Sequence, residues 1–529
     1  MIELAMLLAA AAAGFGIARL FGLPAIPFLI FAGFCLSLVA HMESAYLQDS
    51  LVLGITFLVF VAGMELNPRR VRRQKTAAVA VGTVQFIVLG ALGYVAARAL
   101  SFDAQTSVYL ALALTASSTL VVVRMLQRRR QLFESFGRLV IGVLLLQDLA
   151  VILLIPVVTR LPEGTASVAV GVGGTLVLAV VAYVLLRWVL PELLRRLSLD
   201  EELLLLAVLA LLFSFLFASQ QFGVPLVSGA FLAGLALSSF PLNGVVRGQL
   251  NSLADFFTAI FFTALGASLG VPTVVEVGQA LVLALVVVLV TTPLVAFIAE
   301  RAGFSARPAI FSGLLLSQTS EFSLVVGLQG VMAAQIGDST FTVITLVTLI
   351  TMTLTPFLAN DRLAIGLMHL HPARRSPVRS DEPPEGHVLL LGCGVSGMPL
   401  LETLVIGAHR VVAVDDDPQI VERVREAGVE AIRGDAADVS LLRRAGADRA
   451  RVVVSTVRVE DNEHLLAMAG DVPVLVRVFN VEDADWIRAR GGTPVLYSDA
   501  AAEGFLEWFD RGGWERPDEL ADEEMEQVL

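Results

Sequence analysis

Long apolar segments dominate the first 360 residues of this chain and limit what it can fold into. Of its 529 residues, 56% are apolar, which is more than soluble globular domains contain. A transmembrane helix needs about 20 predominantly apolar residues. About thirteen segments are long enough to span a bilayer: 2–20, 24–40, 49–66, 76–100, 105–123, 138–159, 165–190, 202–220, 224–240, 255–270, 274–298, 309–335 and 340–359. The sequence therefore predicts a polytopic α-helical membrane domain over residues 1–360.

The composition becomes charged after Pro372. Residues 361–385 are rich in proline and charge and lack periodicity, so we interpret them as a linker. We expect an α/β domain over residues 386–510, followed by an acidic tail over residues 511–529. Because acidic residues outnumber basic ones in this last part of the chain, nucleic acid is not expected as a partner.

Basic residues gather in the connections that follow odd-numbered apolar segments. The positive-inside rule therefore predicts an N-terminus outside the cell, a cytoplasmic α/β domain and a multi-pass protein of the inner (plasma) membrane. These residues are Arg69, Arg70, Arg72, Arg73 and Lys75 after the third segment, Arg124, Arg128, Arg129, Arg130 and Arg138 after the fifth, Arg195 and Arg196 after the seventh, and Arg301 and Arg307 after the eleventh.

One carboxylate lies in the middle of an apolar segment. Asp148, preceded by Gln147, has apolar residues for about two turns on each side. An ionised Asp at the bilayer centre costs about 2.5–3.5 kcal/mol on insertion scales. Removal from water favours the neutral acid, so a proton and a metal cation can compete for the carboxyl. We predict that Asp148 binds them alternately; the alternative is a carboxyl satisfied by a neighbouring helix for packing alone.

Two polar clusters interrupt apolar segments seven segments apart: Thr115-Ala-Ser117-Ser118-Thr119 and Ser317-Gln318-Thr319-Ser320-Glu321. The odd offset predicts inverted repeats, and broken helices at matching places in such repeats indicate a transport site near the midplane. We therefore predict that Ser117, Ser118, Thr119, Gln147, Gln318 and Glu321 join Asp148 in an ion site. The alternatives are Ser and Thr side chains that bond to their own helices, and a structural role for Glu321.

The eleventh apolar segment bears on the charge moved in each cycle. It contains Thr291 and Thr292 but no Lys or Arg in its apolar stretch that could pair with Asp148. A single titrating carboxyl predicts one cation exchanged per proton, which is electroneutral exchange.

A glycine loop with a downstream acid indicates a nucleotide site in the α/β part. The strand-like stretch 387–391 leads into Gly392, Gly394 and Gly397, and a helical pattern follows to about Ile406. Such glycines permit a tight turn and close approach of the backbone to a phosphate at the helix N-terminus. Asp415 follows a second strand about 20 residues later, where the acid that binds ribose hydroxyls belongs.

Further strands complete a predicted parallel sheet. A third short strand precedes Asp435, the fourth ends at Thr456, and two more are expected at 474–478 and 494–497. We include Asp435 and Thr456 in the predicted site because both follow strand ends. The expected ligand is an adenine nucleotide, NAD(H) or AMP/ATP, and a Rossmann fold that has lost its ligand is the alternative.

Together these motifs resemble the monovalent cation:proton antiporter-2 family, in particular its Kef-type potassium efflux systems. In the membrane part the resemblance rests on Gly63-Met-Glu-Leu66, Ser117-Ser118-Thr119, Gln147-Asp148, Gly229-Ala-Phe-Leu-Ala-Gly234 and Gln318-Thr-Ser-Glu321-Phe322, and after it on the glycine loop, Asp415-x-Asp417-Pro418 and Gly434-Asp435-Ala436. It implies a homodimer with a mobile core domain, K+ or Na+ and H+ as substrates, Asp148 as the shared carboxylate, and an RCK (regulator of potassium conductance) domain at residues 386–510.

One position departs from the Kef-type pattern. Kef-type proteins carry an Arg in the glycine loop that helps to hold glutathione, and this chain has Val395 there. The long extension that follows their nucleotide domain is also missing. Glutathione gating is therefore not expected, whereas control by a nucleotide is.

Other functions fit the sequence less well than potassium/proton exchange regulated by a nucleotide. Sodium/proton exchange on the same fold is the second candidate. An RCK-gated potassium channel would need a filter such as Thr-Val-Gly-Tyr-Gly, which the sequence lacks. A nicotinamide-dependent membrane enzyme would need an acid, base or thiol pair beside the glycine loop, where Cys393 stands alone, so we do not expect an enzyme.

Overall fold

The protein is described by a computed structural model of residues 2–40, 42–65, 75–129, 131–132, 134–189, 201–238, 244–360, 363–364, 366–367, 383–394 and 396–510. It divides into two compact units. The first comprises residues 1–302 and 306–371, and the second comprises residues 303–305 and 372–529. Most of the expected linker, the whole acidic tail and the basic residues at 69–73 and 195–196 lie outside the described residues.

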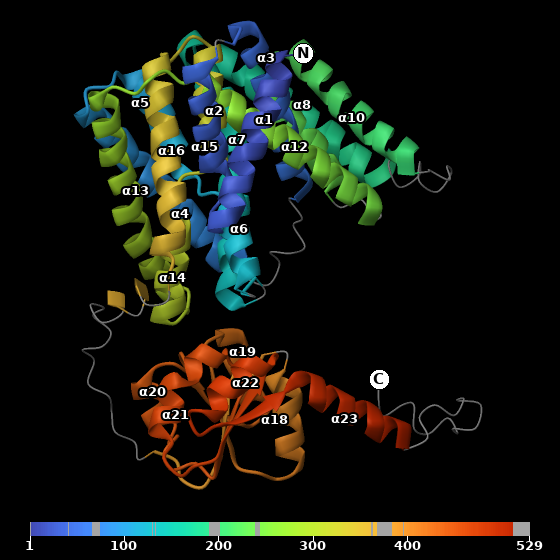
Figure 1. The fold of residues 1–529 in the computed structure, drawn as a ribbon, viewed down its shortest axis with the longest axis vertical. Helices are drawn as coiled ribbons and strands as arrows, with labels where there is room; N and C mark the ends of the chain where they lie inside the picture. Colours follow the sequence, from blue (N-terminus) through green and yellow to red (C-terminus); the bar gives the residue numbers. More distant parts are fainter. Residues whose placement is uncertain are drawn as a thin grey trace. The chain divides into compact units, whose positions relative to one another are not determined.

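The first unit is entirely helical among its described residues (Figure 1). Each of the thirteen expected apolar segments coincides with a helix or with a pair of consecutive helices. The helices are α1 (Ile2–Phe21), α2 (Ala25–Val39), α3 (Ser44–Glu65), α4 (Lys75–Ala99), α5 (Ala104–Thr115), α6 (Thr119–Arg128), α7 (Ser135–Arg160), α8 (Thr165–Val184), η2 (Leu185–Val189), α10 (Glu201–Gln221), α11 (Leu226–Leu237), α12 (Gly244–Ser268), α13 (Val274–Arg301), α14 (Ala306–Leu316), α15 (Glu321–Met332) and α16 (Asp338–Leu358).

The expected count of thirteen complete spans is not confirmed. In the described part of the chain, eleven segments are long and apolar enough to cross a membrane. The other two, α2 and α11, have 15 and 12 residues. At 1.5 Å per residue they reach about 22 and 18 Å, short of the hydrocarbon thickness of about 30 Å. Both begin directly after a proline, Pro24 and Pro225, which precedes the first helical residue in each case.

Both expected breaks in the helices are confirmed. The fifth apolar segment is divided into α5 and α6 by residues 116–118, and the twelfth is divided into α14 and α15 by residues 317–320. Ser and Thr side chains compete with the helix for backbone hydrogen bonds, which explains why the helices stop at these clusters.

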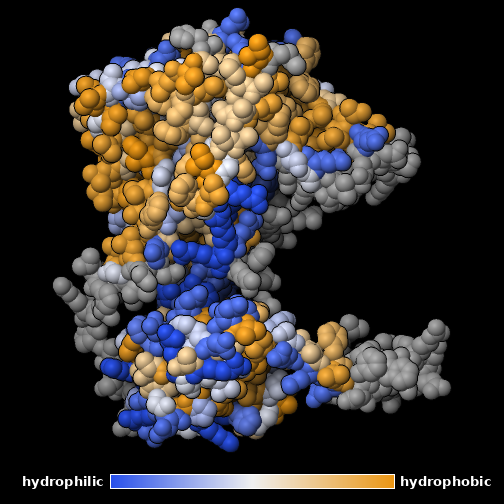
Figure 2. Space-filling model, in the orientation of Figure 1, coloured by the Kyte–Doolittle hydropathy of each residue, from blue (hydrophilic) through white to orange (hydrophobic). Residues whose placement is uncertain are grey.

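Apolar side chains cover most of the visible surface of the helical unit, with hydrophilic residues mainly toward its ends, whereas the second unit shows mixed polar and apolar residues (Figure 2). Large exposed apolar residues are frequent on α1, α4, α8, α10 and α13. In water such continuous apolar surface would be unfavourable, but against lipid it is expected.

The helices of the first unit pack in two groups. One contains α1, α2, α3, α10, α11 and α12; the other contains α4 to α7 and α13 to α16; and α8 contacts α7 as well as α10 and α11. We call them the first and second helix groups.

Glycines bring backbones together inside the first group. A Cβ on Gly33 would lie 1.9 Å from the Thr263 carbonyl oxygen, and one on Gly266 would lie 1.9 Å from that of Ile30. Small residues let membrane helices approach in this way. The α2–α12 contact therefore depends on having no side chain at either position.

The contact of α3 with α11 repeats this arrangement. A Cβ on Gly63 would lie 2.3 Å from the Phe231 carbonyl oxygen, and one on Gly234 would lie 2.0 Å from that of Phe60. In both contacts, each glycine lies against the carbonyl group of the residue three positions before the glycine on the partner helix. The short helix α2 therefore packs on α12 in the same way as the short helix α11 packs on α3. This correspondence is expected of two repeats.

The second unit contains a six-stranded parallel sheet with the order β3-β2-β1-β4-β5-β6. Its strands are β1 (Val388–Leu391), β2 (Val411–Asp415), β3 (Glu430–Arg433), β4 (Val452–Ser455), β5 (Val474–Val478) and β6 (Thr493–Leu496), with helices α18 (Gly397–Ile406), α19 (Pro418–Glu426), α20 (Val439–Arg444), α21 (Glu463–Met468), α22 (Val481–Arg488) and α23 (Tyr497–Asp510). This is the Rossmann order, in which ligands bind beyond the carboxyl ends of β1 and β4, where the strand order reverses. The predicted α/β Rossmann-like domain is confirmed.

We expect Gly266→Ala to lower the stability of the helical unit. The new methyl group would lie 1.9 Å from a backbone oxygen, and overpacking of this kind typically costs about 1–3 kcal/mol. The melting temperature of the detergent-solubilised protein measures the effect. Gly278→Ala is the control, because a Cβ there would meet nothing within 4 Å. Equal melting temperatures for the two variants would contradict the close contact.

Candidate functional site

The two helix breaks of the second group lie against each other. Ser117, in the break between α5 and α6, donates its hydroxyl to the Leu316 carbonyl at the end of α14 at 2.7 Å. Ser323, in the first turn of α15, donates its hydroxyl to the Ala113 carbonyl near the end of α5. Backbone at membrane depth must find hydrogen-bond partners inside the protein, and each break supplies partners for the other.

Both half-helices that leave the breaks begin with a serine cap. The Ser118 hydroxyl accepts from the Val121 N–H at 3.3 Å at the start of α6, and the Ser320 hydroxyl accepts from the Phe322 N–H at 3.1 Å at the start of α15. Glu321 is the first residue of α15. A helix N-terminus carries partial positive charge, which favours a carboxylate there.

Asp148 lies beside the first break, on α7. The Thr119 hydroxyl donates to Asp148 Oδ2 at 2.7 Å. The Asp148 residue is 4% exposed, and its Oδ1 atom has no hydrogen-bond partner among the described residues. A buried oxygen of this kind costs free energy unless another ligand or a proton engages it.

The neighbouring amides show the same incomplete pairing. Gln147 Oε1 accepts from the Ser117 N–H at 3.1 Å, and Gln318 Nε2 donates to the Leu315 carbonyl at 3.3 Å. Within the described parts of the chain, Gln147 Nε2, Gln318 Oε1 and Glu321 Oε2 have no partner. Gln147 therefore holds the first break in place. Among the described residues, unpaired oxygens remain on Asp148 beside the first break and on Gln318 and Glu321 in the second.

A cavity of about 310 Å³ leads from these residues to the ends of several helices. Its inner lining includes Thr119, Asp148 and Glu321, and its outer lining includes Glu65, Arg124, Arg128 and Asp255. Because α1, α2, α3 and α12 line one side and α6, α7 and α15 the other, the cavity lies between the two helix groups. A hydrated cation or water can reach Asp148 through a space of this size.

The structure places the predicted ion-site residues in three positions. Asp148, Thr119 and Glu321 line the cavity. Ser117, Ser118 and Gln147 organise the first break, and Gln318 lies in the second break away from the cavity lining. Sequence reasoning missed Asp255, which pairs with Arg124 at 4.0 Å at the outer end of the cavity; its place near the start of an apolar segment gave no signal.

The glycine loop of the second unit follows β1. Gly392 has φ +82°, and its carbonyl accepts from the Thr456 hydroxyl at 2.8 Å. A Cβ on Gly397 would lie 1.9 Å from the Gly392 carbonyl oxygen. Thr456, at the end of β4, therefore closes this loop, and Gly392 and Gly397 are required by the loop itself.

Gly394 differs from the other two glycines. A Cβ there would meet no atom of the described protein within 4 Å, and its φ is not in the left-handed region. Packing and backbone conformation therefore do not explain why residue 394 is a glycine. The close approach of a phosphate to the loop would explain it. Val395, the next residue, lies outside the described residues.

Asp415 ends β2 and turns its carboxylate toward the loop. Its Oδ2 accepts from the Cys393 N–H at 2.6 Å and its Oδ1 from the Asp417 N–H at 2.8 Å. Burial raises the pKa of Asp415, and these backbone donors oppose the shift. The carboxylate that was expected to bind ribose thus also supports the glycine loop.

Cys393 is completely buried in the loop. Burial, together with the nearby Asp415 carboxylate, raises the pKa of the thiol to about 12. A thiol that stays protonated is a poor nucleophile, and Cys393 acts here as a small buried side chain.

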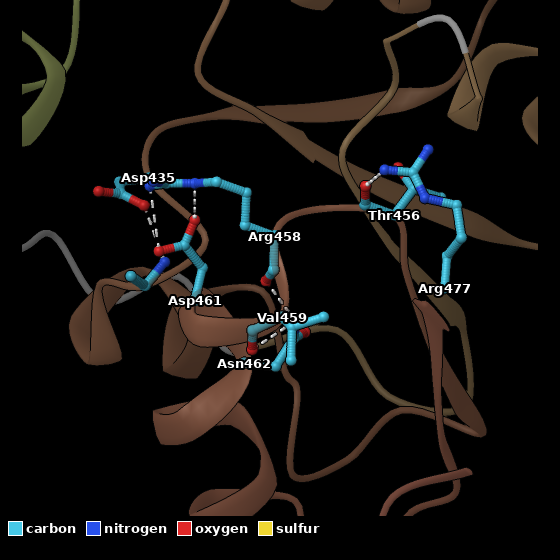
Figure 3. Close-up of polar contacts among 8 residues, drawn as sticks. Asp435, Thr456, Arg458, Val459, Asp461, Asn462 and Arg477 are labelled. Atoms are coloured by element: carbon cyan, nitrogen blue, oxygen red, sulfur yellow. Dashed lines mark hydrogen bonds and ion pairs between the residues drawn. The ribbon is translucent and has the colours of Figure 1, made fainter. Parts of the chain in front are cut away.

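Polar residues crowd the carboxyl ends of β3, β4 and β5 (Figure 3). Asp435 accepts from the Ala437 N–H at 2.9 Å, and Arg458 pairs with Asp461 at 3.0 Å. Arg477 Nη2 donates to the Thr456 carbonyl at 2.6 Å, and burial lowers the pKa of Arg477. Sequence reasoning missed Arg458, Asp461 and Arg477, although Arg477 is the one charged residue in an apolar strand.

Two family models match the chain. The sodium/hydrogen exchanger transmembrane model matches residues 5–360 and therefore covers more than half of the chain. The TrkA-N domain model matches residues 388–498, the part that forms the parallel sheet.

Individual relatives agree with these matches. The chain is 27% identical over 452 residues to the glutathione-regulated potassium-efflux system protein KefC of Shigella flexneri serotype 5b (strain 8401), covering 83% of this chain and 72% of the relative. Identity to KefC of Escherichia coli (strain K12) is 26% over the same length. The sodium proton antiporter MjNhaP1 of Methanocaldococcus jannaschii aligns in structure over 70% of this chain and 99% of its own, with a TM-score of 0.56 and 15% identity, which shows a shared fold.

We expect Gly397→Ala and Gly394→Ala to separate the two roles of the loop. Only the first places a methyl group against a backbone oxygen, and overpacking of about 1–3 kcal/mol raises the population of the open state several-fold. Limited proteolysis of the second unit in the purified full-length protein should be at least about fivefold faster in Gly397→Ala. Gly394→Ala, the matched control, should be cleaved at the wild-type rate. Faster cleavage of Gly394→Ala would show that this glycine, too, is structural.

Proposed function

The chain belongs to the sodium/hydrogen exchanger family of transmembrane proteins, and from that premise we propose that it exchanges K+ for H+ by alternating access, under the control of an adenine nucleotide bound to its TrkA-N domain. Potassium is favoured over sodium because the KefC relatives, named as potassium-efflux systems, match along both units. Sodium/proton exchange on the same fold is the second candidate.

One observation carries the transport proposal: a buried carboxylate faces a cavity and keeps one oxygen unpaired. Among the described residues, only Thr119 donates a hydrogen bond to Asp148, which lines the cavity between the helix groups. A monovalent cation can share the unpaired oxygen with hydroxyl and amide oxygens of the breaks. A proton can occupy the same oxygen, because removal from water favours the neutral acid.

Competition at Asp148 links the two fluxes. When the cation leaves, the buried carboxylate is stabilised by taking up a proton, and a protonated Asp148 no longer attracts a cation. Glu321, on the same cavity, is proposed as a ligand or as a partner of its helix dipole. Arg301, the only Lys or Arg on α13, lies at its carboxyl end, so we propose that one cation exchanges for one proton without net charge movement.

The remaining features are proposed on the family resemblance. Basic connections favour an N-terminus outside and a cytoplasmic TrkA-N domain in an inner-membrane protein, and the active form is proposed to be a homodimer. The open position at Gly394 and the carboxylate of Asp415 support nucleotide binding. Glutathione control, a property in the name of the KefC relatives, is not proposed, because Val395 replaces the Arg expected there.

Asp148→Asn should abolish exchange and leave folding intact, because the neutral amide cannot cycle a proton. Cation-driven proton flux in proteoliposomes measures this, with K+, Na+ and Rb+ compared to settle selectivity. The control is Asp255→Asn, which neutralises an exposed carboxylate at the outer end of the same cavity and should retain exchange. Wild-type flux in Asp148→Asn would contradict the mechanism.

Gly394→Ala should weaken binding of an adenine nucleotide at least about tenfold, which corresponds to 1.4 kcal/mol. The methyl group occupies the space through which a phosphate would approach, and it disturbs no protein contact. Calorimetry on the purified full-length protein with NAD, AMP and ATP measures the binding. Asp415→Ala should also bind weakly, but it loses the support of the loop as well.

The control for nucleotide binding is Glu402→Gln, on the exposed side of α18. If the nucleotide controls transport, Gly394→Ala should also lose the response of the proton flux to added nucleotide, since coupling between sites is reciprocal. A wild-type protein that binds none of the three nucleotides at millimolar concentration would end the proposal of nucleotide control and leave the exchange proposal standing.

A further inference from the structure

Arg160, the last residue of α7, reaches across to the first helix group. Its Nη2 donates to the carbonyl of Gly223, and its Nη1 donates to the Ser167 carbonyl at 3.3 Å. Gly223 lies in the connection between α10 and α11. Hydrogen bonds from a charged donor are worth more than neutral ones, so Arg160 joins the helix that carries Asp148 to the opposite helix group.

Two glycines make room for the Arg160 side chain. A Cβ on Gly171 of α8 would lie 2.7 Å from Arg160 Cδ, and one on Gly223 would lie 2.6 Å from Arg160 Nη2. Gly223 has φ +61°, a conformation that other residues rarely adopt. The partly exposed Arg160 side chain therefore packs closely against backbone at both positions.

The contact of Arg160 lies at the end of α7 that is away from the cavity. The half-helix α6 runs from Thr119 beside Asp148 to Arg128 at the outer end of the cavity, and a short connection leads on to the start of α7. Arg160 lies at the opposite end of α7, about 18 Å beyond Asp148 at 1.5 Å per residue. The cavity thus opens at one end of α7, and the link between the helix groups lies at the other.

We propose that Arg160 is a gating residue of the exchange: its bonds to Gly223 and Ser167 close the second access route to Asp148 and break when that route opens. This rests on the alternating access proposed above. Opening the boundary between the helix groups at this end would separate α7 from the α10–α11 connection. Arg160 acts through the position of α7 and does not touch the cation.

Cysteine labelling from each side of the membrane tests this proposal. Cys35 and Cys393, the two cysteines of the chain, are replaced by serine, and Val151→Cys is introduced as the reporter. Val151 is 1% exposed and lies one turn beyond Asp148 toward Arg160, on the same face of α7. A membrane-impermeant methanethiosulfonate is applied to sealed vesicles of both orientations.

With the reagent on the side of Arg160, Val151→Cys should be labelled about tenfold faster in the Arg160→Gln variant than in the parent. A tenfold change is what the loss of one charge-assisted hydrogen bond would give. The labelling rate of Arg160→Lys, which keeps the charge, should lie between those of Arg160→Gln and the parent. The matched control is Arg98→Gln. Arg98 also donates to a carbonyl, that of Phe102, at 2.5 Å, at the end of α4 that lies on the same side as Arg160. This bond stays within one helix group.

An unchanged rate in Arg160→Gln, or an equal rise in Arg98→Gln, overturns the proposal. If Arg160→Gln gives no folded protein by size-exclusion chromatography, Arg160→Lys decides: a faster rate than the parent supports the gate, and the parent rate overturns it. Labelling needs no transport. Proton flux recorded in the same vesicles therefore shows separately whether exchange itself fails.

Discussion

A carboxylate in the middle of a membrane segment requires partners that a continuous helix cannot supply, and the helical unit is organised around this requirement. Thr119 can donate to Asp148 because α5 stops and α6 starts beside it. That break is tolerated because Ser117 and Gln147 engage its backbone and that of α14. Removing the second break would deprive the first of the Leu316 carbonyl and the Ser323 hydroxyl. The two breaks and the carboxylate therefore form one unit.

The first helix group has a different physical basis. Gly33, Gly63, Gly234 and Gly266 bring backbones into contact, in two arrangements that repeat each other. Contacts without side chains leave little freedom for adjustment, so this group is suited to stay rigid. The cavity lies where this rigid group meets the group that holds Asp148. Movement at that boundary changes access to the carboxylate without disturbing the packing on either side.

Local chemistry made much of this predictable from the sequence. Polar clusters at 115–119 and 317–321 predicted both breaks, because Ser and Thr side chains bond to nearby backbone groups and disfavour a continuous helix. The glycine loop and strand-like stretches such as 387–391 and 474–478 predicted the parallel sheet. The short lengths of α2 and α11 were missed, since the predicted segments 24–40 and 224–240 also took in the residues on either side of each helix. Contacts such as Gln147 to the Ser117 N–H or Arg160 to Gly223 join segments far apart in the sequence, and no local pattern predicts such pairs.

The glycine loop shows how structure and ligand chemistry can share residues. Gly392, Gly397, Thr456 and Asp415 hold the loop through their own contacts, so their presence alone does not demonstrate a ligand. Gly394 has no such structural reason. A loop already fixed by the protein presents its backbone N–H groups without an ordering cost, and preorganisation of this kind strengthens binding. The residues that build the loop therefore support nucleotide binding by fixing the backbone. Gly394 supports it by leaving space beside the loop, and among these residues it is the one that the fold itself does not require.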